Sequence, residues 1–540
     1  MLSFDQALTA AGQLVFFGFD GCSLNSHARR AIEELHLGNV ILFTRNYQNP
    51  QQFSALIHQL QQKALKHNGA PLFVAADQEG GSVMRTIGGA TWYPGPMATR
   101  AAGCGPALAQ EVGSGIGAEM ARMGLNFALA PLADLADNPD SAHIGSRSYG
   151  ADPTACAPYL EAFVQGMQRH VIATAKHFPS IGGSRVDLHL ELGRNLQSAE
   201  HLKQVEMAPV RAAVRAGVAA VMTSHEVYPA LEDCPGTLSP VILQQYLRQE
   251  CGFQGLIVSD CMEMKALCQR VPAPEACVRA VQAGVDLLLI CHTENVQAAC
   301  VQELARAIQD GRISQSRLDQ SLERIRRAKQ ALNCAPCDPH PETDPVFIRG
   351  RALTEDVCKR ALTADGDASV FRCRPDQRFL LIAPPPAALT MADEAQRSHD
   401  LCSAVAQAFP AAECVGFSFP LCPEELESIR VLLRSGHYEK VLFATYNLHT
   451  DPGQQALADA VFSAGLPVGA IALRTPYDAR WFGPAQSSLF CYEYTPAMIA
   501  AVLALMRGEI SCTGRLPEDV ATILEREKER FHVQKNDGLH

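Results

Sequence analysis

The chain lacks several features that define common classes of protein. Its 540 residues include 46 Lys and Arg against 57 Asp and Glu, which gives a formal net charge of -11, and no block is rich in Lys or Arg. This deficit of positive charge argues against nucleic acid as a partner. No apolar run approaches the roughly 18 residues that span a bilayer, and no basic segment leads into an apolar stretch at the N-terminus. We therefore expect a cytoplasmic protein that does not enter membranes.

The 19 cysteines lack the spacing of a disulfide framework. Their number is odd, and Cys251, Cys291 and Cys491 lie inside apolar segments. Free buried thiols are typical of a reducing compartment. The one close pair, Cys334 and Cys337, lacks the second pair of a structural zinc site, so we interpret it as part of a linker, with a metal or redox role as the alternative.

Length and hydrophobic pattern predict two α/β domains. In residues 1–332, short apolar runs alternate with longer amphipathic stretches, which is the pattern of repeated β-α units and predicts a (β/α)8 TIM-type barrel. A segment rich in Pro, Asp and Cys, 333–345, is the predicted linker. Residues 346–540 are expected to form a smaller α/β domain. The predicted barrel strands are 14–17, 40–43, 72–76, 127–130, 172–175, 218–222, 256–258 and 285–290, and those of the second domain include 379–382, 441–445 and 468–473.

Ionisable side chains follow several of these apolar runs. Asp77 follows the third run, Lys176 the fifth and Asp260 the seventh, and His225 lies just beyond the sixth. In parallel α/β proteins, catalytic groups sit at the carboxyl ends of the strands. These residues are therefore expected at one mouth of the barrel.

Two of the segments carry groups suited to breaking a glycosidic bond. A carboxylate such as Asp260 at a barrel mouth can attack an anomeric carbon and leave again, as in retaining glycosidases, although a helix N-cap is the alternative interpretation. His189 follows Asp187 by two residues, and a carboxylate there can fix the tautomer of the imidazole and raise its basicity. A loop histidine bonded to backbone is the alternative for His189.

Further polar residues are candidates for binding a sugar. Lys176, His177 and the loop 77–81, which begins with Asp77, offer donors and acceptors for hydroxyl groups. Arg85 and Arg147 are suited to bidentate contacts from neighbouring loops. Each of them is equally compatible with a surface position or a structural ion pair.

Motifs spread over nearly the whole first domain occur in one order. They are 38–46 (GNVILFTRN), 77–81 (DQEGG), 126–128 (NFA), 144–150 (IGSRSYG), 176–179 (KHFP), 187–189 (DLH) and 259–260 (SD). Together they resemble glycoside hydrolase family 3, in particular its exo-β-N-acetylglucosaminidase branch. The resemblance implies a TIM-type barrel followed by a C-terminal α/β sandwich domain.

The resemblance also implies roles for individual residues. Asp260 is the implied nucleophile and His189 the implied acid/base, with Asp187 orienting that histidine. The residues implied to hold the terminal sugar are Asp77, Arg85, Arg147, Lys176 and His177, with Arg147 near the 2-acetamido group.

The chain departs from the pattern of this branch at a few positions. Where the branch usually reads Pro-Gly-His-Gly, this chain has Ser180 and Ile181 between Pro179 and Gly182. Cys261 stands where a second aspartate is common. We expect these departures to affect substrate range and rate, while the reaction type is kept.

The expected function is that of a retaining exo-glycosidase that removes terminal β-linked N-acetylglucosamine from muropeptide or chitin-derived oligosaccharides. The partner is a small saccharide, no metal or organic cofactor is required, and the oligomeric state is left open. Phosphorolysis is one alternative, since a neutral histidine would not repel phosphate as an anionic acid/base would. The altered loop at Ser180 and Ile181 suggests a second alternative, a saccharide-binding protein that has lost catalysis.

Overall fold

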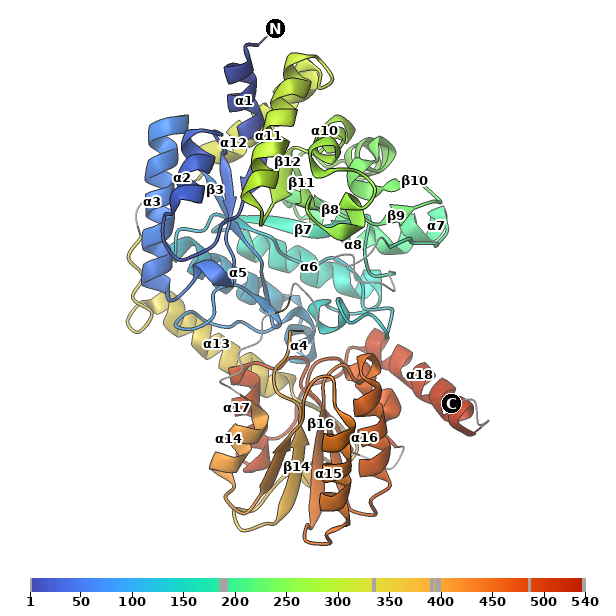
Figure 1. Cartoon of the computed structure of the whole chain (residues 1–540). Coiled ribbons are helices and arrows are strands. Elements are labelled where there is room, and N and C mark those ends of the chain that lie inside the picture. The colour runs from blue at the N-terminus through green and yellow to red at the C-terminus, as the bar shows by residue number, and fades with distance from the viewer. Residues whose placement is uncertain are drawn as a thin grey trace.

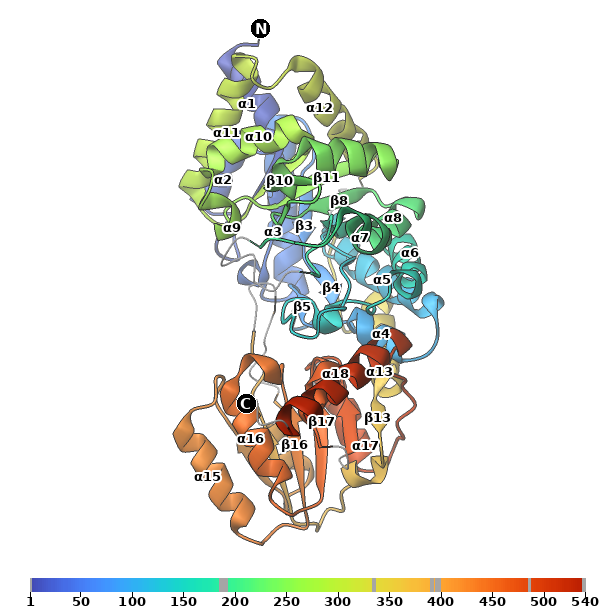
Figure 2. The same cartoon turned by 90° about the vertical axis from the view of Figure 1, so that its right-hand side faces the viewer.

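The computed structural model describes residues 2–183, 193–332, 337–388, 393, 400–483 and 487–536. It has two parts, one above the other in Figures 1 and 2. The N-terminal part is a closed barrel surrounded by helices, and the C-terminal part is an open sheet between two layers of helices.

Eight parallel strands close the barrel, in the order β1-β12-β11-β8-β7-β6-β3-β2. Their side chains fill the interior, where the rings of Phe16, Phe73 and Phe127 meet with centroids 5.2 to 6.3 Å apart. The barrel is therefore a packed core, and polar groups have room only at its ends. The strands are β1 (Val15–Phe17), β2 (Asn39–Ile41), β3 (Phe73–Ala76), β6 (Phe127–Ala128), β7 (Ile172–Phe178), β8 (Ala220–Thr223), β11 (Leu256–Cys261) and β12 (Leu287–Ile290).

Helices between the strands cover the barrel. Local signals set their ends, as in α3 (Pro50–Asn68), where Asn49 accepts a hydrogen bond from the backbone N–H of Gln52 and Gly69 ends the helix at φ 66°. Further helices of this part include α1 (Phe4–Gly12), α2 (Ser26–Glu33), α4 (Pro96–Ala101), α5 (Pro106–Arg122), α6 (Pro153–Met167), α7 (Ala199–His201), Leu202–Glu206, α8 (Ala208–Arg215), Val241–Glu250, α9 (Lys265–Cys268), α10 (Ala273–Ala283), α11 (Glu294–Gln309) and α12 (Gln315–Gln330). Short hairpin strands complete it: β4 (Gln78–Gly80), β5 (Val83–Met84), β9 (Val227–Tyr228) and β10 (Glu232–Pro235).

The second part is a six-stranded sheet of order β13-β18-β17-β16-β14-β15, in which β13 alone is antiparallel to its neighbour. Alternate residues of one strand face opposite layers. Leu381 packs in the core under α14 and α17, whereas Leu380 packs in the core under α15 and α16. The elements are β13 (Thr363–Asp365), β14 (Phe379–Ala383), α14 (Leu401–Ala408), β15 (Glu413–Gly416), α15 (Pro423–Arg434), β16 (Lys440–Thr445), α16 (Pro452–Phe462), β17 (Val468–Ala472), β18 (Ser487–Phe490), α17 (Pro496–Met506) and α18 (Glu518–Asn536).

Helix α13 (Pro345–Ala361) joins the two parts. Phe347 near its start packs in the barrel core, and Val357 near its end packs in the core of the second part. Both views place α4 at the junction, where Arg100 pairs with Asp519 of α18 at 2.8 Å. The division of the chain into domains 1–332 and 346–540, joined by a linker at 333–345, stays a prediction, because helix α13 contributes to the hydrophobic cores of both parts.

The predicted fold class is confirmed, with eight barrel strands in the predicted places. One detail is wrong: Lys176 and Asp260 were expected to follow their strands, but each lies within the last residues of its strand. The second sheet also has three strands that were not predicted, β13, β15 and β18.

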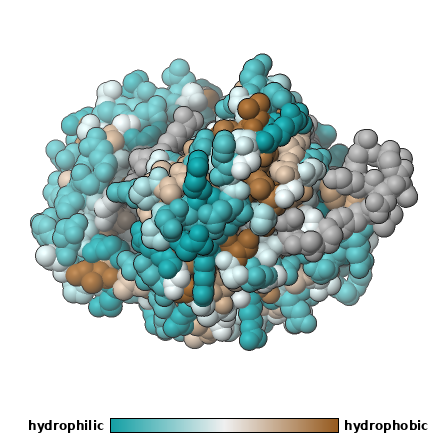
Figure 3. Space-filling view, turned by 90° about the horizontal axis from the view of Figure 1, so that it is seen from below, coloured by the Kyte–Doolittle hydropathy of each residue, from teal (hydrophilic) through white to brown (hydrophobic). Residues whose placement is uncertain are grey.

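Two observations concern the helices and the surface of the protein. Within the described residues, no helix combines the length and apolar character needed to cross a membrane. Viewed from the end formed by the second part, the surface is mainly hydrophilic, and its hydrophobic residues form small separate patches (Figure 3).

Candidate active site

Three strands near the barrel mouth carry a β-bulge. The registers place one extra residue between Gln78 and Gly80 of β4, between Lys176 and Phe178 of β7, and between Val258 and Cys261 of β11. The bulges thus include Glu79, His177 and Asp260. A bulge redirects the side chain of the extra residue. His177 and Asp260 thereby face each other at the mouth, whereas Glu79 is buried.

Asp260 and His177 face each other across the mouth. The Nε2 atom of His177 lies 3.8 Å from Oδ2 of Asp260, and the Asp260 side chain is 23% exposed. The other carboxylate oxygen, Oδ1, accepts a hydrogen bond from the backbone N–H of Cys261 at 2.7 Å. Asp260 is thus held from one side and accessible from the other.

Asp134 fixes the position of His177. Its Oδ2 accepts from Nδ1 of His177 at 2.8 Å and from the backbone N–H of the same residue at 3.2 Å. Its Oδ1 accepts from the hydroxyl of Ser180 at 3.1 Å and from the backbone N–H of Ile181 at 2.7 Å. Burial would raise the pKa of Asp134, but the neighbouring His177 outweighs it and holds the pKa below its ordinary value.

Asp77 lies at the end of β3 between two cations. Lys176 donates to its Oδ1 at 2.8 Å, and Arg85 donates to its Oδ2 at 3.1 Å. Burial would raise the pKa of Asp77, but Lys176 and Arg85 together hold the pKa well below its usual range. The carboxylate therefore stays ionised, and it can accept a hydrogen bond from a sugar hydroxyl.

Glu79 is fully buried behind this pair. Arg147 binds it in a bidentate manner, with Nε to Oε2 and Nη2 to Oε1 both at 2.9 Å, and Lys176 reaches Oε1 at 2.6 Å. Burial would raise the pKa of Glu79, but these two cations lower it to about 2. Lys176 therefore links Asp77 and Glu79 into one network.

The second part of the chain reaches the same network. Its buried Arg474 forms a bidentate pair with Asp393, with both N–O distances at 2.8 Å. Burial would lower the pKa of Arg147, but Glu79 and, at longer range, Asp393 raise it. The charge of Asp393, from the second part, thus acts on Arg147 of the barrel.

The structure brings together six of the residues singled out from the sequence: Asp77, Arg85, Arg147, Lys176, His177 and Asp260. Asp187 and His189 lie outside the described residues. His225 is fully buried beside the end of β11, where its Nε2 lies 2.9 Å from the carbonyl oxygen of Cys261.

Sequence reasoning missed Asp134, Asp393 and Arg474, and it included Glu79 only as part of the loop 77–81. Asp134 had a signal, because it is the polar residue that ends the apolar run beginning at Phe127. Nothing in the local pattern pointed to the pair formed by Asp393 and Arg474.

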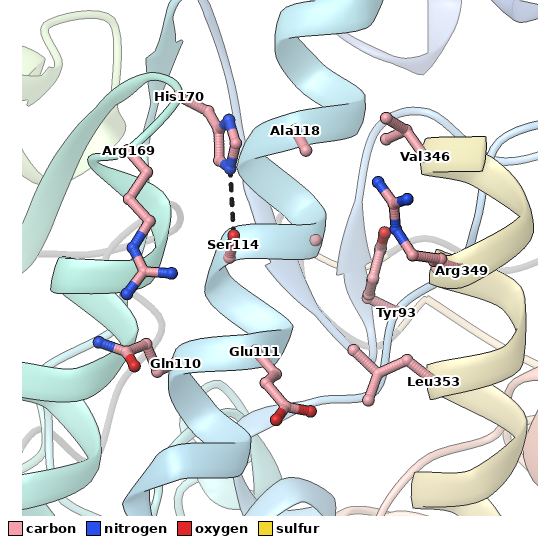
Figure 4. A pocket seen from close by; sticks show the side chains of 12 residues that line it. Tyr93, Gln110, Glu111, Ser114, Ala118, Arg169, His170, Val346, Arg349 and Leu353 are labelled. Carbon is pink, nitrogen blue, oxygen red and sulfur yellow. Dashed lines mark hydrogen bonds between the residues drawn. The ribbon is translucent and has the colours of Figure 1, made fainter. Parts of the chain in front are cut away.

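A separate cavity of about 460 Å³ lies between α5 and α13 (Figure 4). Ser114 on α5 bonds to Nε2 of His170 at 3.1 Å, and Arg169 and Arg349 lie on either side of α5 in this view. His170 precedes β7, so the cavity lies away from the end of that strand. None of the site residues predicted from the sequence lines it.

The fold and the site define an enzyme of the α/β-barrel class, with its polar groups at the carboxyl ends of the strands. Residues 9–328 match the family model described as "Glycosyl hydrolase family 3 N terminal domain". The chain therefore belongs to glycoside hydrolase family 3, and it is a glycoside hydrolase.

Individual relatives agree with this assignment. The Beta-hexosaminidase of Tolumonas auensis is 37% identical over 276 residues, which cover 50% of this chain and 80% of that protein. The Beta-hexosaminidase of Hydrogenovibrio crunogenus is 34% identical over 284 residues, which cover 52% and 78%. The solved structure of a family 3 β-N-acetylglucosaminidase from Paenibacillus sp. str. FPU-7 has a TM-score of 0.86 at 32% identity, and the match covers 96% of this chain and 99% of that one.

Proposed function

We propose that this chain is a retaining exo-β-N-acetylglucosaminidase that acts on small saccharides such as muropeptide fragments or chitin-derived oligosaccharides. The observation that carries the proposal is the partly exposed Asp260 carboxylate, which lies in a bulge at the barrel mouth beside a buried array of charged groups. The activities named for the relatives support the choice of sugar.

The proposed reaction has two steps. Asp260 attacks C1 of the terminal sugar while protonated His189, oriented by Asp187, donates its proton to the leaving oxygen. His189 then takes a proton from water, the water oxygen bonds to C1, and Asp260 leaves. Carboxylate and imidazole chemistry suffice for both steps.

We propose that the network around Asp77 binds the terminal sugar. Lys176 and Arg85 keep Asp77 ionised as an acceptor, and their remaining N–H groups are donors for the same hydroxyls. Arg147, anchored on Glu79, is proposed to stand near the 2-acetamido group.

His177 is proposed to complete this subsite. Because Asp134 holds Nδ1 of His177, the other ring nitrogen, Nε2, faces Asp260. The 3.8 Å between Nε2 and Oδ2 of Asp260 exceeds hydrogen-bond length, so a sugar hydroxyl can bond to either atom without displacing a bond between them.

The first experiment tests the nucleophile. Asp260→Asn, which keeps the shape of the side chain, should abolish turnover of an aryl β-N-acetylglucosaminide, and circular dichroism checks the fold. A 5-fluoro-N-acetylglucosaminyl fluoride should label the wild-type peptide that contains Asp260. Wild-type turnover by Asp260→Asn, or a label on another peptide, would refute the assignment.

The second experiment tests the acceptor and the acid/base. We expect His189→Ala to lose turnover of substrates with poor leaving groups, because these depend most on protonation of the leaving oxygen. The wild-type enzyme should release N-acetylglucosamine equally with and without phosphate. Release of N-acetylglucosamine 1-phosphate would instead favour phosphorolysis, and tight saccharide binding without bond cleavage would favour a binding protein.

The third experiment compares two natural substrates, a muropeptide and chitobiose, at equal concentration. The ratio of their kcat/KM values assigns the substrate class.

All 18 cysteines in the described part of the chain are free thiols, which supports the proposal that the enzyme works in the reducing cytoplasm.

A further inference from the structure

Two thiols and an imidazole meet beside the proposed nucleophile. The ligand atoms of Cys261, Cys291 and His292 lie within 4.8 Å of one another. Cys261 ends β11, while Cys291 and His292 directly follow β12, the neighbouring strand of the barrel. Within the residues that the structure describes, this is the one group of His, Cys, Asp or Glu side chains with such geometry.

The donor set suits a soft or borderline divalent cation. Zn²⁺ prefers thiolate and imidazole ligands, and a tetrahedral site with Zn–S and Zn–N bonds of about 2.3 and 2.0 Å places neighbouring ligand atoms about 3.5 to 3.8 Å apart. Atoms that already lie within 4.8 Å need only a small side-chain adjustment to reach this spacing. Three protein ligands leave the fourth position open to water.

The turn that carries two of the ligands is fixed by its own hydrogen bonds. Glu263 accepts from the backbone N–H of His292 at 2.7 Å and from that of Thr293 at 3.0 Å. Arg45 donates to the carbonyl oxygen of Cys291 at 2.8 Å. A turn held in this way loses little conformational freedom when an ion binds, and the exposed side chain of His292 gives the ion access.

We propose that Cys261, Cys291 and His292 form a three-ligand site for Zn²⁺ or a similar thiophilic cation, and that occupancy of this site inhibits the enzyme. Binding of Zn²⁺ releases the protons of the two thiols, so two thiolates balance the charge of the ion. The backbone N–H of Cys261 is bonded to Oδ1 of Asp260, so an ion that draws the sulfur of Cys261 toward Cys291 and His292 also shifts the backbone group that holds the nucleophile. The displaced carboxylate is no longer aimed at the anomeric carbon, and turnover falls. The proposed inhibition rests on the proposed function of the enzyme, whereas binding of the metal ion does not.

The binding test uses the full-length enzyme, stripped with a chelator, kept in a phosphine reductant and titrated with Co²⁺. We expect one Co²⁺ per chain, thiolate-to-cobalt charge-transfer absorption, and displacement of Co²⁺ by Zn²⁺. Cys291→Ser and His292→Ala should each weaken binding by about 100-fold or more, because loss of a ligand costs more than the 10- to 100-fold loss caused by an outer partner. The matched control is Cys104→Ser, which removes an exposed cysteine elsewhere and should bind as wild type does.

The titration contains no substrate, so it decides the site even if the proposed function fails. A wild-type protein without charge-transfer absorption, or an unchanged affinity in His292→Ala, would overturn the site. In the activity arm, Zn²⁺ should slow hydrolysis of an aryl β-N-acetylglucosaminide at the same half-saturation as binding, and His292→Ala should resist it. Stoichiometric binding of Zn²⁺ without loss of turnover would refute the proposed inhibition.

Discussion

Replacement of Asp134 by Asn tests whether the site depends on one buried carboxylate. The two oxygens of Asp134 accept four hydrogen bonds, from His177 twice and from Ser180 and Ile181. Asn keeps one acceptor oxygen and places an amide N–H₂ against donors, so two of the four bonds are lost. At about 1.5 to 3 kcal/mol for each hydrogen bond to a charged group, the variant loses about 3 to 6 kcal/mol.

Part of this loss should appear in catalysis. If about 3 kcal/mol is expressed in the transition state, kcat/KM falls about 100-fold, because each 1.36 kcal/mol is a factor of ten. The hydrogen bonds of Asp134 to Ser180 and Ile181 also anchor the residues that precede the segment containing Asp187 and His189. Turnover of an aryl β-N-acetylglucosaminide, measured well below the unfolding temperature, gives the size of the effect.

The matched control is another buried, multiply bonded aspartate. Asp286 accepts from Arg248 at 2.7 Å, from Arg317 at 2.6 Å and from Ser321 at 2.7 Å, but it lies at the start of β12, the opposite end of the barrel. Asp286→Asn should lower the unfolding temperature comparably and leave kcat/KM unchanged. If Asp134→Asn stays within threefold of wild type, or if Asp286→Asn loses as much activity, the reasoning is wrong.

Two further predictions concern charges that the site and the domain junction share. Lys176→Met leaves Asp77 and Glu79 without their common cation and should destabilise the protein by about 3 to 5 kcal/mol. Thermal unfolding measures this loss, and an unchanged unfolding temperature would contradict the shared network. Burial raises the pKa of Glu493, which accepts from the backbone N–H of Gly95 at 2.7 Å, to about 7 from its ordinary 4.5. A raised pKa means that the folded state binds the proton more tightly, so this stabilisation is complete below pH 4.5 and is lost as pH rises through about 7. The free energy of unfolding of Glu493→Gln should therefore rise relative to that of wild type as pH increases, by on the order of 3 kcal/mol at pH 8. Thermal unfolding at several pH values measures this. A difference in unfolding temperature that does not change with pH would refute the raised pKa of Glu493.

Apolar runs in the sequence were enough to predict the barrel. Strands buried on both faces read as short continuous hydrophobic segments, and the polar residues near their ends lie at one mouth because parallel strands share a direction. This logic found Asp77, Lys176 and Asp260. Arg85 and Arg147 follow none of the predicted barrel strands. They were singled out because a guanidinium can make bidentate contacts from a neighbouring loop, and the resemblance to a family gave them a role.

The bulges were beyond sequence reasoning for a physical reason. A period-two pattern describes one strand, whereas a bulge is a relation between two strands, set by which backbone groups pair. The pair formed by Asp393 and Arg474 has a similar origin, because its members are 81 positions apart and meet only once the second sheet has formed.

The bulge at Asp260 shows how the chain satisfies the backbone groups that such an irregularity disturbs. The backbone N–H of Leu289 on β12 donates at 3.0 Å to the hydroxyl of Ser259 rather than to a carbonyl of β11. The backbone N–H of Cys261 donates to the carboxylate of Asp260 itself. Side chains thus take over backbone pairing at the point where the strand bends, which leaves few unpaired groups in a buried place. The same bonds fix the direction of the carboxylate, so the irregular pairing and the placement of the proposed nucleophile have a single structural cause.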